Sequence, residues 1–400
     1  MKLRNFYFIW WTTATLIACN PPISWPTVQV EKLVNPADTA SVFPSLSADS
    51  QQLWMGWLDE KNKEESSYQI ASFDGNNWSS AQRTAQGNDW FVNWADFPTI
   101  TALNDQHLLL HTLEKSGPDP YAYDIKLRFR DQRLQWSQAL KPYEDSSATE
   151  HGFPSFVPLD GERSAAIWLD GRNYAEGGNE NMMLAYSEFD QKGHASPTQF
   201  LDQRVCDCCQ TDMAMSSQGL IAVYRDRSPQ EVRDIYLVRQ EDDKWTEPKP
   251  LHPDNWQING CPVNGPAIAA KGDTVAVAWF TSAGGEARVL GSLSFDAGKN
   301  FSKPSLIDAA QALGRVDIVL DQQNRAWVSW IRKDQDTAQI QLCTFKADGS
   351  KSPAYKIHPI NPRRKSGFPQ LMYWQNKMWL AWTATEPQNQ IQIVKITIDG

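Results

Sequence analysis

The chain has 400 residues, of which 41% are hydrophobic and 21% are charged, and its formal net charge is -9 at pH 7. This composition is ordinary for a folded protein and excludes an intrinsically disordered chain. Acidic and basic residues are mixed along the whole length, which argues against nucleic acid as a partner. The 18 tryptophans are the unusual feature, because each of them buries a large area, as long all-β proteins require.

The first residues have the composition of an export signal. Lys2 and Arg4 form a basic start, and residues 6–18 form an apolar run. The run is long enough for a signal peptide but too short to cross a bilayer. The sequence therefore predicts an exported protein.

The end of this run reads LIAC, with Cys19 as the last residue, and it resembles the lipobox of bacterial lipoproteins. The resemblance implies that residues 1–18 are a lipoprotein signal peptide and that Cys19 is lipidated. Asn20 follows the cysteine, which in that family favours the outer membrane of the cell envelope. Residues 19–26, with three prolines, are expected to form a tether to the membrane. An ordinary secretory signal with an incidental cysteine is the alternative.

One pattern recurs seven times after the tether: a short strand that opens with Phe-Pro or a variant, a turn, and an apolar strand that ends in an aromatic residue. The copies begin at Phe43, Phe97, Phe153, Gln210, Gly265, Val316 and Phe368. Two more strand-like runs follow each copy, and four short strands per unit are typical of a propeller blade. The sequence therefore predicts one all-β domain over residues 27–400, a seven-bladed β-propeller with four-stranded antiparallel blades. Six blades, or two packed β-sandwiches, are the alternatives.

The last unit ends at Gly400 after only three strands. Residues 28–34 precede the first unit and have no other partner, so we expect them to supply the missing strand. This pairing would close the ring and cover an exposed sheet edge.

The fifth unit contains SFDAGKNF, from Ser294 to Phe301, which resembles the Asp-box (BNR) turn of sialidase-like propellers. In such a turn, Ser294 and Asp296 would hydrogen-bond the hairpin backbone and Gly298 would take a positive φ. The aromatic ring of Phe301 would pack under the blade. The resemblance therefore implies a sialidase-like β-propeller, and it assigns these four residues a structural role.

The resemblance does not extend to sialidase chemistry. Sialidases depend on an arginine triad, a Tyr–Glu pair and an acidic acid/base residue. The strand that should hold the first arginine reads Val42-Phe43-Pro44-Ser45, without one. True sialidases also have six blades. A standard sialidase is therefore not expected.

Propeller geometry places the loops that join blades on the same face as the loops that join second and third strands. We call this the top face, and we expect the Asp-box hairpins on the opposite one. The top-face loops contain four cysteines from neighbouring units, which are Cys206, Cys208, Cys209 and Cys261. In an exported protein these cysteines predict disulfides, with Cys206–Cys209 as the plausible short bond. A copper or zinc site is the alternative, since thiolates select these ions, and redox-active thiols are a third.

Charged residues are predicted on the same face. The candidates for ligand binding are Arg172, Arg225, Arg227, Arg233, Arg315, His151 and Asn264, because guanidinium groups suit carboxylates, sulfates and phosphates. The candidates for catalysis are Asp170, Asp226 and Asp234, since glycoside hydrolysis needs two carboxylates across the substrate. Ion pairs that fix the loops are the alternative for each of them.

Three functions remain open. The first is a cell-envelope lipoprotein that binds an anionic glycan, peptide or protein partner at the top face. The second is a glycan-active hydrolase or lyase with different catalytic residues from those of sialidases. The third is a protein that handles copper or zinc through the cysteines. The fold does not discriminate between them, because propellers serve all three.

Overall fold

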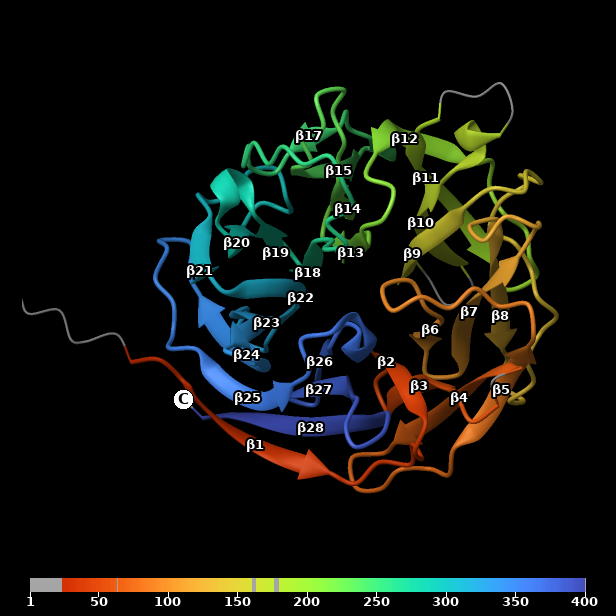
Figure 1. The fold of residues 1–400 in the computed structure, drawn as a ribbon, viewed down its shortest axis with the longest axis horizontal. Coiled ribbons are helices and arrows are strands. Elements are labelled where there is room, and N and C mark those ends of the chain that lie inside the picture. The colour runs from red at the N-terminus through yellow and green to blue at the C-terminus, as the bar shows by residue number, and fades with distance from the viewer. Residues whose placement is uncertain (1–23, 63, 160–162, 176–179, 400) are drawn as a thin grey trace, which may run out of the picture.

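The structure is a computed structural model that describes residues 24–62, 64–159, 163–175 and 180–399. These residues form seven antiparallel sheets around a central axis (Figure 1). The predicted seven-bladed β-propeller is therefore confirmed, and the six-bladed and sandwich alternatives are wrong. The predicted signal peptide and Cys19 lie outside the described residues. Within the described part, no helix is long and apolar enough to span a membrane.

The first three blades follow one another around the ring, and the strands of each blade are ordered from the axis outwards. Blade 1 consists of β2 (Ser41–Ala48), β3 (Leu53–Asp59), β4 (Ser66–Phe73) and β5 (Gln82–Gly87). Blade 2 consists of β6 (Thr99–Asn104), β7 (His107–Lys115) and β8 (Tyr123–Arg130). Its outer position holds only the isolated bridges Leu127–Leu140 and Arg130–Trp136 in place of a fourth strand. Blade 3 consists of β9 (His151–Pro158), β10 (Arg163–Asp170), β11 (Met182–Asp190) and β12 (Gln199–Val205), with the 3-10 helix η1 (Arg172–Tyr174) between β10 and β11.

The next three blades repeat this arrangement. Blade 4 consists of β13 (Asp212–Ser216), β14 (Gly219–Arg225) and β15 (Ile235–Glu241), with its outer strand split into β16 (Lys244–Trp245) and β17 (Lys249–Pro250). Blade 5 consists of β18 (Ala267–Lys271), β19 (Thr274–Thr281), β20 (Arg288–Ser294) and β21 (Ser305–Ala309), with η2 (Ala283–Gly285) between β19 and β20. Blade 6 consists of β22 (Ala312–Leu320), β23 (Ala326–Asp334), β24 (Thr337–Phe345) and β25 (Tyr355–Ile360).

The seventh blade closes the ring with the N-terminal strand, as the sequence predicts. After η3 (Arg364–Ser366), it consists of β26 (Gln370–Trp374), β27 (Lys377–Ala384) and β28 (Gln390–Asp399), and β1 (Thr27–Leu33) is its outermost strand. β1 runs antiparallel to β28 from the pair Thr27–Asp399 to the pair Leu33–Ile393. Figure 1 shows the two strands side by side at the rim of the ring.

The core lies between blades, because each sheet packs its apolar faces against both neighbours. The second strands are therefore almost continuously buried, and all eight residues of β19 are buried. Fully buried tryptophans fill the spaces between sheets, and the indole N–H groups of four of them donate to carboxylates. Trp279 donates to Asp254 at 2.7 Å, and Trp330 donates to Asp308 at 2.7 Å. The high tryptophan content is thus explained by packing between blades.

The recurring Phe-Pro pattern joins each blade to its neighbour. Phe43 and Phe153 both have a positive φ of 53° at the start of an innermost strand. Their N–H groups therefore turn away from their own sheet. The N–H of Phe43 donates to Thr383 Oγ1 in blade 7 at 2.9 Å, and that of Phe153 donates to Asp96 Oδ2 before blade 2 at 3.0 Å. These bonds explain why the pattern recurs at the same place in several units.

The Asp-box segment forms a hydrogen-bonded hairpin between β20 and β21. Ser294 Oγ donates to Asp296 Oδ1 at 2.7 Å, and the N–H of Gly298 donates to Ser294 Oγ at 2.9 Å. Asp296 Oδ1 also accepts the N–H of Asn300 at 2.9 Å, and Gly298 has a φ of 79°. Phe301 packs against a cluster formed by blades 4 and 5.

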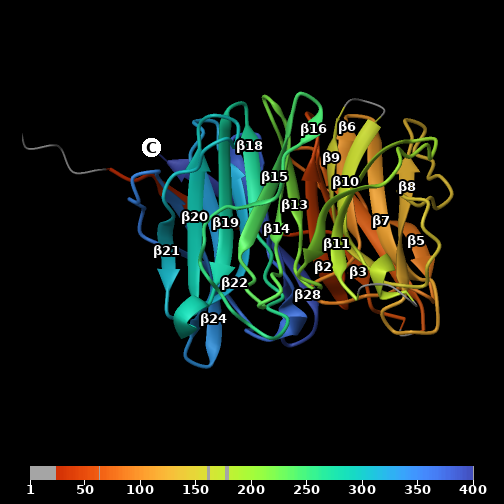
Figure 2. The ribbon, with the colours of Figure 1, turned by 90° about the horizontal axis from the view of Figure 1, so that it is seen from above.

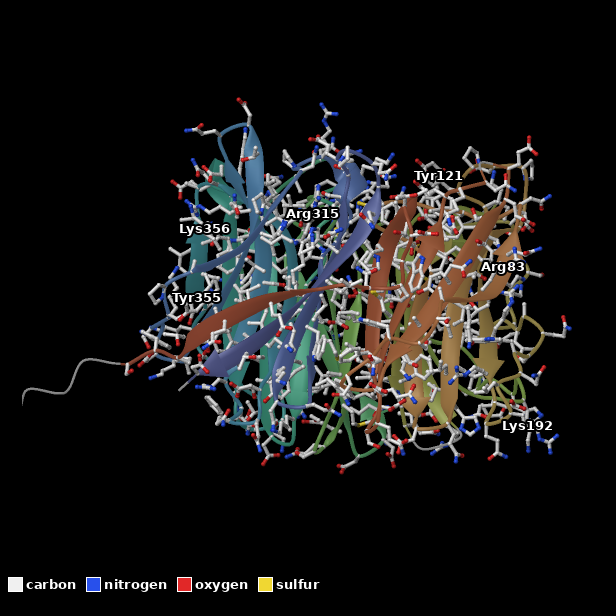
Figure 3. All side chains as sticks on the ribbon, turned by 90° about the horizontal axis from the view of Figure 1, so that it is seen from below. Arg83, Tyr121, Lys192, Arg315, Tyr355 and Lys356 are labelled. Atoms are coloured by element: carbon white, nitrogen blue, oxygen red, sulfur yellow. The ribbon has the colours of Figure 1, made fainter. Side chains whose placement is uncertain are left out.

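The strands run between two faces of the ring (Figure 2). Tyr121, in the loop between β7 and β8, lies near one face, and Lys192, in the β11–β12 hairpin, lies at the opposite face (Figure 3). The first belongs to a second-to-third loop and the second to a third-to-fourth loop. The predicted division of the loops between two faces is therefore present.

Candidate functional site

Two loops of the top face bring four cysteines together. Cys206, Cys208 and Cys209 lie between β12 and β13, with their sulfur atoms all within 4.8 Å of one another. Cys206 Sγ is 3.5 Å from Cys209 Sγ and 3.9 Å from Cys208 Sγ. Cys261, from the loop between β17 and β18, lines the same cavity as Cys208. We call these four residues the thiol cluster.

The predicted disulfides are not formed in the structure. All five described cysteines, namely the thiol cluster and Cys343, are free thiols. A distance of 3.5 Å between Cys206 and Cys209 is well beyond the roughly 2.05 Å of an S–S bond. The cysteines thus meet where the sequence predicts, but as neighbouring thiols.

A guanidinium group lies against the buried side of the thiol cluster. Arg233 Nη1 donates to Cys206 Sγ at 3.2 Å, and Glu231 Oε2 accepts from Arg233 Nη2 at 2.7 Å. Hydrogen bonds from Cys208 and Cys209, together with Arg233, hold the pKa of Cys206 well below its usual range, although burial opposes them. Burial raises the pKa of Cys209 to about 12. Of the two buried thiols Cys206 and Cys209, Cys206 therefore has the lower pKa.

Arg225 is a structural residue in this geometry. Its guanidinium is 1% exposed and donates to the carbonyl oxygens of Asn264 at 2.7 Å, Arg233 at 2.6 Å and Phe280 at 2.8 Å. The group also lies 4.9 Å from the centre of the Trp256 ring. It joins blades 4 and 5, and all three of its nitrogen atoms donate to backbone carbonyls, so its predicted ligand role stays a prediction.

The other predicted arginines are also engaged by the protein. Arg315, which lies within β22, is buried and donates to Ser366 Oγ at 2.9 Å and to the Gly367 carbonyl at 3.1 Å. The remaining ion pairs are Arg172 with Asp170, Arg227 with Asp207 and Glu231, and Arg233 with Glu231. For these residues the structure favours the alternative in which ion pairs fix the loops.

The predicted catalytic carboxylates differ in their surroundings. Asp170 is buried and accepts from Trp168 Nε1 at 2.9 Å. Asp234 accepts two backbone N–H groups of the loop between β17 and β18. Burial raises the pKa of Asp226 to about 7. Asp170 and Asp234 therefore act as buried acceptors for their own loops, and the catalytic role of the three residues stays a prediction.

His151 and Asn264 are likewise internal. His151 is fully buried, with its Nε2 atom 3.2 Å from Asp145 Oδ2 and its ring stacked on Tyr143 at 4.6 Å. Asn264 Oδ1 accepts the N–H of Arg315 at 2.7 Å, which joins blade 5 to blade 6. Their predicted ligand role has no exposed donor or acceptor to support it.

A cavity of about 320 Å³ opens beside the thiol cluster on the top face. We call it the rim cavity. Cys208 and Cys261 form part of its wall. The residues that sequence analysis missed are the aromatic Phe91, Trp94, Tyr121 and Tyr123, the acidic Glu150 and the basic Arg364. Tyr121 is 60% exposed. The rim cavity thus combines aromatic surfaces with one cation, Arg364, and two acids, Glu150 and Asp207, of which Asp207 pairs with Arg227.

Arg364 is the arginine of the rim cavity that could meet a ligand. It lies at the start of η3, is exposed, and has its guanidinium 5.6 Å from the centre of the Trp94 ring. In the described part of the chain, no acidic side chain pairs with it. Its positive charge is therefore open to an anion, unlike those of the predicted arginines.

Tyr123 joins two carboxyl groups at the back of the rim cavity. Its hydroxyl lies 2.9 Å from Asp96 Oδ2 and 2.8 Å from Glu150 Oε1. One hydroxyl proton can serve only one acceptor, so the other carboxyl group must hold a proton of its own. Burial raises the pKa of Asp96 to about 7 and that of Glu150 to about 8. The pair therefore shares a proton near neutral pH.

This shared proton predicts an unusual dependence of stability on pH. The folded chain holds the Glu150 proton up to about pH 8, whereas an unfolded glutamate loses it near pH 4. Between pH 4 and pH 8 the folded state therefore binds one proton more than the unfolded state. The stability that this proton contributes is fully present below pH 4 and is lost as the pH rises towards 8. We expect Glu150→Gln to reduce this loss by about 2 kcal/mol, from urea unfolding at pH 5 and pH 8. The exposed Glu64→Gln is the matched control, and an equal change in both variants would contradict the shared proton.

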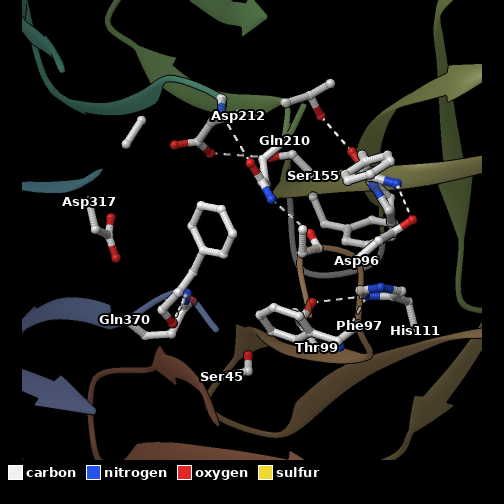
Figure 4. Close-up of a pocket in the computed structure, with 18 of the residues that line it drawn as sticks. Ser45, Asp96, Phe97, Thr99, His111, Ser155, Gln210, Asp212, Asp317 and Gln370 are labelled. Carbon is white, nitrogen blue, oxygen red and sulfur yellow. Dashed lines mark hydrogen bonds between the residues drawn. The ribbon is translucent and has the colours of Figure 1, made fainter. Parts of the chain in front are cut away.

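A second cavity, of about 270 Å³, lies on the axis of the propeller (Figure 4). It is lined by the innermost strands and the loops before them, and its acids include Asp212 and Asp317. Their carboxylates accept the N–H groups of Ile268 at 2.8 Å and Leu371 at 2.6 Å in the following blades. Burial raises the two pKa values to about 6 and about 7. These acids hold blades together, so the candidate site is the rim cavity with the thiol cluster.

Comparisons with known proteins bear on the fold. No family model and no curated protein matches the chain. A protein of unknown function from Dyadobacter fermentans is 10% identical over 93% of this chain and 99% of that chain, with a TM-score of 0.54. The NanB sialidase from Streptococcus pneumoniae is 11% identical over 91% of this chain and 71% of that chain, with a TM-score of 0.47. The intramolecular trans-sialidase from Ruminococcus gnavus is 10% identical over 90% of this chain and 94% of that chain, with a TM-score of 0.45. The similar structures are sialidase-type and other β-propellers, and at these identities the likeness concerns the fold alone.

Proposed function

We propose that this protein is a cell-envelope lipoprotein that binds an anionic glycan in the rim cavity. The observation that carries the proposal is Arg364, an exposed guanidinium without an acidic partner among the described residues, at a cavity with aromatic walls. The envelope location is supported by the apolar run before Cys19. A protein at this location would meet extracellular or surface glycans, which are therefore the proposed ligands.

The walls of the cavity support a sugar rather than a bare ion. Phe91 stacks on Tyr123 with ring centres 4.0 Å apart, and Tyr121 lies against the outer side of Phe91. Aromatic surfaces with few polar groups are typical of sites that hold ring-shaped ligands. Arg364 would hold a carboxylate or sulfate, since guanidinium groups match these anions in shape and charge. Acidic peptides and proteins are the competing ligands.

Glycan binding is expected to depend on Arg364. Arg364→Ala should weaken binding of an acidic polysaccharide about tenfold or more, because it removes a charge-assisted hydrogen bond. Polygalacturonate and heparin are the probes, dextran is the neutral comparison, and calorimetry measures the affinity. Arg83→Ala, an exposed arginine on the outer strand β5, is the matched control (Figure 3). Equal binding by both variants, or preference for acidic peptides over polysaccharides, would contradict the proposal.

A glycan-active enzyme is the second candidate. It is favoured by Glu150, whose burial raises its pKa to about 8 and keeps it protonated at neutral pH, as a general acid requires. Glu150 lines the rim cavity, and its Oε1 atom accepts the hydroxyl of Tyr123. Appearance of shortened chains in the same polysaccharide samples, lost in Glu150→Gln, would favour this candidate over binding alone.

A further inference from the structure

The thiol cluster is drawn from two neighbouring blades and does not take part in the proposed glycan contacts of Arg364. Cys206 and Cys209 are buried, Cys208 is half-buried and Cys261 is exposed. Neighbouring sulfur atoms therefore extend from the interior to the surface of the top face. A buried cysteine packs only as a small apolar residue, so packing alone does not explain why four thiols gather at one point.

The distances between the sulfur atoms match those of ligands to one metal ion. Four sulfur atoms about 2.3 Å from a tetrahedral zinc ion lie about 3.8 Å from one another. The observed separations are 3.5 Å for Cys206–Cys209 and 3.9 Å for Cys206–Cys208. The sulfur atoms of Cys206, Cys208 and Cys209 thus already have the spacing of metal ligands. Cys261 lies outside this group of three, but it lines the rim cavity beside Cys208 and is the fourth ligand that the neighbouring blade can supply.

The surroundings carry the charge that such a site needs. Several thiolates around one cation leave a net negative charge, which is costly to bury without a counter-ion. Arg233 lies 3.2 Å from Cys206 Sγ, and Glu231 fixes its orientation at 2.7 Å. Groups that hold the ligands of a metal in this way tune its affinity. Arg233 is 2% exposed and is therefore a fixed part of the site.

We propose that Cys206, Cys208, Cys209 and Cys261 bind one thiophilic cation, either zinc or copper(I), on the top face. Each thiol ligand that still holds its proton releases it to solvent as the metal–sulfur bond forms, and no electron is transferred. Cys261 is the exposed ligand through which the ion reaches the buried sulfurs. The site forms one wall of the rim cavity, but it does not depend on what the cavity binds.

The test is metal binding by the full-length chain, reduced and kept without oxygen. One sample is titrated with zinc and another with copper(I), each against a chromogenic chelator, so that each arm gives the affinity of the reduced chain for that ion. We expect one ion per chain, and X-ray absorption of the zinc form should show sulfur neighbours alone at about 2.3 Å. Oxygen or nitrogen neighbours, or no binding by the reduced protein in either arm, would overturn the proposal.

Two pairs of variants separate the site from general effects on folding. Cys261→Ser changes an exposed ligand and should weaken binding at least about tenfold, whereas Cys343→Ser changes a buried thiol on β24 and should leave it unchanged. Arg233→Met should weaken binding about 10- to 100-fold, and Arg332→Met on blade 6 should not. If Cys343→Ser lowers the affinity as much as Cys261→Ser, the assigned ligands are wrong.

Discussion

Replacing residues 27–33 by an equal run of glycine and serine is expected to lower the free energy of unfolding by about 5 kcal/mol. The seven residues of β1 pair with β28 along their whole length, from Thr27–Asp399 to Leu33–Ile393. Glycine and serine keep the backbone N–H and C=O groups, but glycine has a high entropic cost in a strand, so we expect the strand not to form. Each ladder hydrogen bond that is then lost contributes about 1 kcal/mol net. This loss is a large part of the total stability of an ordinary domain.

The same replacement should also make the protein associate. β28 would become an exposed edge with unpaired N–H and C=O groups and with apolar residues such as Ile393, Val394 and Ile396 along it. Urea unfolding measures the stability, and light scattering measures the association. Glu31→Gln is the matched control, because it removes only the exposed ion pair with Lys395 and should cost under about 1 kcal/mol. A replaced chain as stable as the control would show that β1 does not hold the ring closed.

The architecture of the ring could be predicted from the sequence because it depends on repetition. The aromatic and Phe-Pro positions recur because every unit must pack against two neighbours and donate to the blade before it, as Phe43 and Phe153 do. The outer strands are less regular, since they pack on one side only. Blade 2 therefore has bridges at Trp136 and Leu140 where a fourth strand was predicted, and blade 4 has a split outer strand.

The candidate site was only partly predictable. The loop order placed the thiol cluster correctly, because inter-blade loops share one face whatever their side chains do. The roles of the arginines could not be predicted from the loop order. The partners of Arg225 are backbone carbonyls of neighbouring loops, which leave no mark in a sequence. Arg364 lies among the basic residues before the seventh unit, and nothing in that run shows which of them faces a cavity. Glu150 directly precedes His151 and was overlooked because nothing in the sequence shows that it lines a cavity.

Replacing Arg225 by methionine is expected to destabilise the propeller by about 3 kcal/mol or more. The guanidinium satisfies the carbonyl oxygens of Asn264, Arg233 and Phe280, and an unsatisfied buried acceptor costs about 1–3 kcal/mol. Methionine fills much of the same space but offers no donor. The contact with Trp256 would also lose its cation. Because these contacts join blades 4 and 5, we expect the whole ring to unfold at a lower urea concentration.

Arg364→Met is the matched control for this prediction, since it changes an exposed arginine of the same face. We expect its stability to lie within about 0.5 kcal/mol of the unchanged chain, while its binding of acidic polysaccharide is weakened about tenfold or more. Arg225→Met should show the opposite combination, with lowered stability and with binding retained at low temperature, where the protein remains folded. If Arg225→Met instead kept its stability and lost the ligand, Arg225 would be a ligand residue, and its bonds to the three carbonyls would have to break when the ligand binds.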